Sequence, residues 1–69
     1  MISEIIFVVE EALEGGYQAQ ALGHAIFTEA ETMAELKIML KDAVKCHFDP
    51  PDLPKMIRLH LVKDEIIPA

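Results

Sequence analysis

The three glycines of the chain fall within one stretch, LEGGYQAQALG, and glycines clustered in this way can cradle a phosphate group. Gly15 and Gly16 are adjacent, and Gly23 follows seven residues after Gly16. A phosphate loop also needs a lysine and a Ser or Thr at the start of a helix, so that N–H groups, helix dipole and charge act together. Here the next residues, from Tyr17 on, alternate as in a strand, and no basic residue lies nearby. The stretch therefore predicts a hairpin turn at residues 14–17, with the positive φ angles of a type I′ turn at both glycines.

The residues that could bind a metal or act as nucleophiles are few and poorly spaced. They are His24, Cys46, His47 and His60. Cys46 and His47 are adjacent in a predicted helix, so their side chains point about 100° apart. No Cys-x-x-Cys or His-x-x-x-His spacing occurs, and Cys46 lies near the helix C-terminus, where a reactive thiolate is disfavoured. We therefore predict no metal, no cofactor and no catalytic residue, and we expect a non-enzymatic protein in which Cys46 and His47 are at least partly buried.

The first predicted strand, residues 2–10, is apolar on both faces. Its β-branched and aromatic residues favour a strand. Ile5, Phe7 and Val9 would point to one face, and Ile6 and Val8 to the other. A small antiparallel sheet normally exposes one face to water. Because both faces of this strand are apolar, we expect each face to be covered by a packed layer. One would be the domain's own helix, and the other a second copy of the protein.

The remaining elements complete a single domain spanning residues 1–69. Further strands are predicted at 17–23, 24–30 and 55–62, and a helix at 32–48. Thr32 and Glu35 have the spacing of a capping box at the helix start, and Pro50 ends the helix. The order is β-β-β-α-β, so the predicted fold is two-layered α+β: an antiparallel sheet with one helix packed on one face.

Two stripes divide the predicted helix. Residues at i, i+3 and i+4 spacing form the stripe expected to be buried: Leu36, Met39, Leu40, Ala43, Val44 and His47. Lys37, Lys41 and Lys45 form a second stripe that faces water, and Ile38 lies on this polar side with no core to enter. We therefore include Ile38 in the candidate protein interface, which comprises Ile6, Val8, Ile38, Arg58 and His60.

Charge is distributed unevenly along the chain. The net charge is −6; residues 1–36 carry seven Glu and no Lys or Arg, and residues 37–69 carry six basic and five acidic residues. An acidic surface repels nucleic acid and suits a basic protein partner, although solubility alone would also explain it.

Location and assembly follow from length and composition. The longest apolar run, Ile5 to Val9, is too short to cross a bilayer, and no basic region of a signal peptide follows Met1. A 69-residue chain with one cysteine lacks an internal disulfide, so we expect its stability to depend on self-association. We predict a cytoplasmic protein that forms a dimer or higher oligomer and binds neither membrane nor nucleic acid.

The order of three motifs resembles the HicB-like antitoxin family, also called UPF0150. The motifs are EEALEGGYQAQALG, IFTEAETMAEL and AELKIMLKDAV. Gly15, Gly16 and Tyr17 match the family's hairpin, Gly23 its turn glycine, and Thr32 its helix cap. The family usually has glycine before the cap, where this chain has Ala30.

The resemblance implies a reduced ribonuclease H-like fold and an antitoxin that masks a small, basic, RNA-cleaving toxin of the HicA type. Full antitoxins also carry a C-terminal DNA-binding module; because the sequence stops at Ala69, we expect a short form without it. Nuclease activity is not expected, since Ile5 to Val9 hold no carboxylate for metal ions. The leading hypothesis is a protein-interaction domain of this family. The alternative is a stand-alone regulatory or small-ligand-binding domain without a toxin, and a metal-dependent hydrolase is the third.

Overall fold

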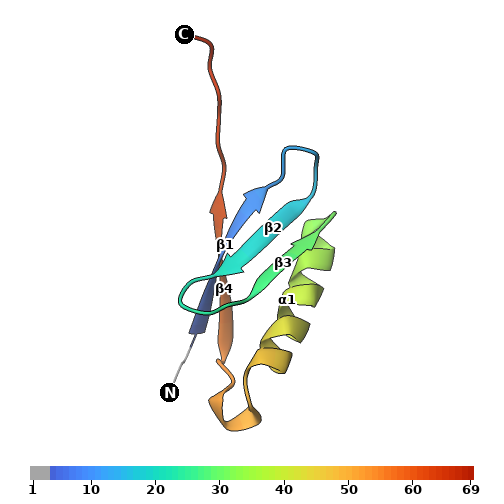
Figure 1. Cartoon of the computed structure of the whole chain (residues 1–69), viewed down its shortest axis with the longest axis vertical. Helices are drawn as coiled ribbons and strands as arrows, with labels where there is room; N and C mark the ends of the chain where they lie inside the picture. The colour runs from blue at the N-terminus through green and yellow to red at the C-terminus, as the bar shows by residue number, and fades with distance from the viewer. Residues whose placement is uncertain (1–3) are drawn as a thin grey trace.

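A computed structural model describes residues 4–69, which form a four-stranded sheet with one helix on one face (Figure 1). The elements in chain order are β1 (Glu4–Glu11), β2 (Tyr17–Ala21), β3 (Phe27–Ala30), α1 (Met33–His47), the 3-10 turn η1 (Pro50–Asp52) and β4 (Met56–Val62). The predicted α+β class and the β-β-β-α-β order are confirmed. Among the described residues, no helix is long and apolar enough to cross a membrane.

The sheet is mixed, with the strand order β3-β2-β1-β4. β1 pairs with β2 and β2 with β3 in antiparallel directions, but β4 lies parallel to β1. The prediction of an antiparallel sheet was therefore wrong at β4. The reason is that α1 carries the chain back to the end of the sheet where β3 began, so β4 runs in the same direction as β3 and β1.

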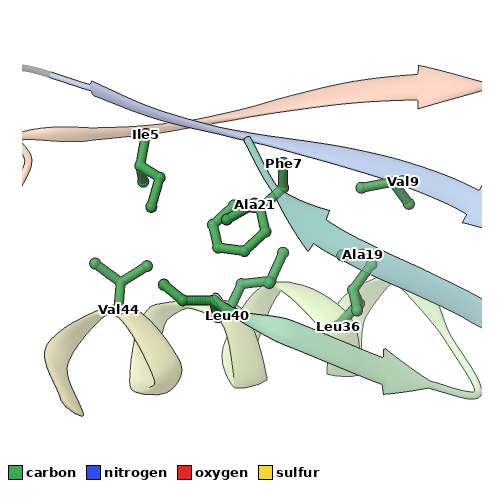
Figure 2. Packing of buried hydrophobic residues seen from close by; sticks show 9 residues of the cluster. Ile5, Phe7, Val9, Ala19, Ala21, Leu36, Leu40 and Val44 are labelled. Atoms are coloured by element: carbon green, nitrogen blue, oxygen red, sulfur yellow. The ribbon is translucent and has the colours of Figure 1, made fainter. Parts of the chain in front are cut away.

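The core lies between α1 and the sheet face that the odd-numbered residues of β1 share. Ile5, Phe7 and Val9 are 0–2% exposed, as the alternation predicted. Figure 2 shows the Phe7 ring directed from β1 toward α1, from which Leu36 and Leu40 point back. Ala19 and Ala21 of β2, both buried, provide small side chains beneath the helix.

The helix begins as predicted, but its buried stripe is narrower. The Thr32 side chain accepts a hydrogen bond of 3.1 Å from the backbone N–H of Glu35, which caps the N-terminus. Leu36, Leu40 and Val44 are buried. Met39 is 44% exposed and His47 is also exposed, so their predicted burial was wrong. A lone helix on a small sheet buries only the residues directly above the strands.

The hairpin between β1 and β2 exists, but its turn lies earlier than predicted. The N–H of Gly15 donates to the carbonyl of Ala12 at 3.0 Å, so Leu13 and Glu14 are the central residues of the turn. Gly15 and Gly16 follow with φ angles of 99° and 82°, which confirms the predicted positive φ. Position 16 also requires glycine for steric reasons, because a Cβ there would lie 2.8 Å from the carbonyl oxygen of Ala30.

Candidate protein-interaction site

The sheet surface opposite α1, here called the open face, has no covering element among the described residues. Strand alternation and register place on it the following residues: Glu4, Ile6, Val8, Glu10, Gln18, Gln20, Phe27, Glu29, Met56, Arg58, His60 and Val62. One row crosses all four strands, because Phe27 pairs with Gln20, Gln20 with Val8, and Val8 with His60. The open face is thus a continuous surface contributed by every strand.

Five apolar side chains of the open face extend across it from β3 to β4, and we call them the apolar patch: Ile6, Val8, Leu22, Phe27 and Met56. Ile6 and Val8 are half-buried among their neighbours, whereas Phe27 and Met56 are 57% and 58% exposed. Leu22 is 56% exposed and belongs to the same patch. Its N–H donates to the carbonyl of Ile6 at 2.9 Å, which extends the pairing of β1 and β2. Because the preceding Ala21 points into the core, alternation turns Leu22 to the open face. A group of exposed apolar side chains on one surface is typical of a binding site.

Charged groups border the apolar patch on two sides. At one end, Glu10 and Glu29 flank Gln18 in a single cross-strand row. At the β4 side, Arg58 forms an ion pair with Glu4, with its Nη2 3.1 Å and its Nε 3.2 Å from Oε2 of Glu4. This pair neutralises its corner of the face, so within residues 4–69 the border charge left without an ion pair is the negative charge of the Glu10–Glu29 row.

The structure brings together four of the five residues predicted for the interface. Ile6 pairs with Arg58, and Val8 with His60, so these four form one contiguous block of the open face. Ile38 does not join them: it is 69% exposed on α1, in the other layer of the fold. Ile38 therefore lies on a different surface from the other four residues, because exposure along a helix does not indicate to which surface of the molecule a residue belongs.

Three residues of the apolar patch were not identified from the sequence. Alternation places Phe27 on the opposite side of its strand from Ile26 and Thr28, but only the structure shows that Ile26 and Thr28 are the buried pair. Leu22 and Met56 lie at strand ends, where the sequence gives no reliable boundary. Their place on the open face depends on the pairing with β1.

A cluster of aromatic rings joins the loop after β2 to the end of α1. The rings of His24, His47 and Phe48 meet edge to face, with centroids 4.9–5.7 Å apart. The prediction that Cys46 is at least partly buried was wrong, since it is exposed. No group of three or more His, Cys, Asp or Glu side chains within residues 4–69 is placed to hold a metal ion. The contact between the two histidines was not foreseen, because it joins residues distant in the sequence.

The fold and its open face define a class of small α+β domain: four strands, one covering helix and one uncovered, partly apolar sheet face. The chain belongs to the UPF0150 family. It is 54% identical over 55 residues to a UPF0150 protein of Archaeoglobus fulgidus, covering 80% of this chain and 82% of that protein. It is 45% identical over 64 residues to a UPF0150 protein of Thermotoga maritima, covering 93% of this chain and 90% of that protein. No family model and no solved structure matches the chain.

Proposed function

We propose that this chain is a non-enzymatic, HicB-like protein-interaction domain of the cytoplasm whose open face binds a small basic protein. In the form that the family resemblance suggests, the partner is an RNA-cleaving toxin, and binding masks its active surface. The observation that carries the proposal is the apolar patch, which the fold leaves exposed beside a row of carboxylates that form no ion pair within residues 4–69.

The chemistry of the apolar patch favours a macromolecular partner over a small ligand. Phe27, Leu22 and Met56 are each more than half exposed and come from different parts of the sheet. Small-molecule sites are usually concave and bury most of their ligand. The open face has a hollow lined by Val8, Gln20 and Phe27, but its volume of about 170 Å³ is smaller than the roughly 300–1,000 Å³ of small-ligand pockets. A partly apolar surface with a polar border is typical of a protein–protein interface.

The charge of one end of the molecule favours a basic partner. The ends of β1 and β3, the hairpin and the start of α1 meet there, and we call this region the acidic end. It carries Glu10, Glu11, Glu14, Glu29, Glu31 and Glu35. Complementary charge accelerates association and selects among partners. Nucleic acid is disfavoured as a ligand of this region, because its phosphates would be repelled.

The proposal is tested with the product of a small basic open reading frame next to the gene for this chain. We expect one-to-one binding by isothermal titration calorimetry, with affinity at least about tenfold weaker for Phe27→Ser because hot spots lie at exposed aromatic anchors. Leu13→Ser is the matched control, since Leu13 is fully exposed at the hairpin turn, away from the apolar patch. Binding that Phe27→Ser leaves unchanged would contradict the assigned surface. Absence of such a neighbouring gene would favour the stand-alone regulatory domain instead.

A further inference from the structure

A second surface, on the helix side of the sheet, is also incompletely covered. The inward-facing residues of β4 pair with the buried residues of β1, but Ile57 and Leu59 are only half-buried and Leu61 is 64% exposed. The cause is the position of α1, which packs over β2 and β3 and does not cover β4 (Figure 1). An apolar groove therefore runs between α1 and β4.

The groove between α1 and β4, here called the basic groove, combines an apolar floor with a rim of positive charge. Leu40 and Val44 of α1 and Ile57 and Leu59 of β4 contribute to its floor. Four lysines stand along its rim: Lys37, Lys41, Lys45 and Lys55. None of these lysines forms an ion pair with a carboxylate of residues 4–69. The helix stripe that was predicted simply to face water thus borders an open apolar surface.

The segment after β4 has the complementary chemistry. Residues 63–69 read KDEIIPA and form no secondary structure. Ile66 and Ile67 are 90% and 79% exposed, and Asp64 and Glu65 directly precede them. Figure 1 shows the segment running away from the body of the molecule. Two acidic residues followed by two large apolar residues match a groove that is apolar and lined by lysines.

The segment after β4 cannot easily fill the basic groove of its own chain, because it starts at the opposite end of β4 from Lys45 and Lys55. Val62 and Lys63 lie beside Glu11 and Met33, at the acidic end. Lys45 and Lys55 lie at the other end of β4, beside Leu53 and Pro54. To reach them, the segment would have to reverse direction immediately after β4, and Asp64 and Glu65 begin instead among carboxylates that repel them.

We propose that this chain forms a two-fold symmetric dimer in which the segment after β4 of each copy docks in the basic groove of the other. Antiparallel pairing of the two β4 edges satisfies this arrangement, because reversing the strand direction brings the segment after one β4 to the start of the other. Asp64 and Glu65 then face Lys41, Lys45 and Lys55, and Ile66 and Ile67 cover apolar surface on the partner.

The edge of β4 is suited to such pairing. β4 is seven residues long and contains neither proline nor lysine, the residues that usually protect an exposed edge. The other edge, β3, has only four residues. Because the dimer uses the β4 edge and the basic groove, it leaves the open face to a partner of different kind and stands independently of the function proposed above.

A pair of charge reversals tests the proposal. Variant A carries Asp64→Lys and Glu65→Lys, and variant B carries Lys41→Glu and Lys45→Glu. All four positions are exposed, so the fold of each variant, checked by circular dichroism, should be retained. Glu35→Lys with Asp42→Lys reverses the same charge as variant A at exposed positions of α1 that do not line the basic groove, and is the matched control.

Light scattering after gel filtration measures the mass of each species against the 7.7 kDa chain. We expect a dimer for the wild type and the control, and dimers at least about tenfold weaker for A and B, because each now places like charges together. Mixing A with B should restore the dimer, since both segment–groove contacts then join opposite charges. A monomeric wild type, dimers unaffected in A and B, or failure of the mixture to recover would each overturn the proposal. In particular, a dimer that persists in A and B but is lost in Ile6→Glu would place the contact on the open face.

Discussion

The two sides of β1 have similar residues and different environments. Ile5, Phe7 and Val9 are 0–2% exposed beneath α1, whereas Ile6 and Val8, on the other side of the same strand, are only half-buried. Hydrophobicity alone does not separate the two sets. The difference comes from what faces them, since one side meets a helix and the other meets solvent. An apolar residue therefore stabilises this fold on one side of the strand and is available for binding on the other.

The largest expected effect comes from the centre of the covered side. Phe7→Ala should lower the free energy of unfolding by about 3–5 kcal/mol, through lost burial and the cavity left between β1 and α1. A domain of this length has a total stability of only about 3–10 kcal/mol, so the variant should be largely unfolded at 37 °C. Denaturant titration followed by circular dichroism measures it. A loss below about 1 kcal/mol would show that the covered side is not the core.

The same substitution, valine to threonine, made separately at Val8 and at Val9 compares the two sides of β1 directly. Val9→Thr places a hydroxyl at a position that is 1% exposed and should cost about 1–3 kcal/mol of unfolding free energy, because the hydroxyl loses its hydrogen bonds to water. Val8→Thr keeps the same shape on the open face, where water can bind the hydroxyl, and should cost less than about 0.5 kcal/mol in the isolated chain. The pair is measured by denaturant titration at low protein concentration. Equal losses would mean that the open face is covered in solution.

A smaller effect is expected where the covering helix begins. Thr32→Ala removes the side-chain oxygen that accepts from the N–H of Glu35, and should cost about 1 kcal/mol. Thr32→Ser keeps that oxygen and serves as the control. The measurement is the thermal midpoint of unfolding together with the helical signal. If Thr32→Ala and Thr32→Ser have the same thermal midpoint, the side-chain cap does not stabilise α1.

The two candidate interfaces differ in how far the sequence could reveal them. Ile6 and Val8 were predicted to face away from the helix because strand alternation is local, and Arg58 and His60 followed in the same way. The partners that complete the apolar patch, Phe27, Leu22 and Met56, became neighbours only through strand pairing. The basic groove was not predicted at all, because it lies between α1 and a strand whose position beside β1 no local pattern specifies.

The amino-acid sequence by itself determined the kinds and order of the elements. Side-chain alternation, the Thr32 cap, the prolines that follow α1 and the positive-φ glycines are short-range features, and each acts within a few residues of the chain. The tertiary structure alone decided that β4 lies parallel to β1, which lysines border an apolar groove and that Ile38 stands apart from the open face. These outcomes depend on where α1 returns the chain, and that path is set by packing among residues distant in the sequence.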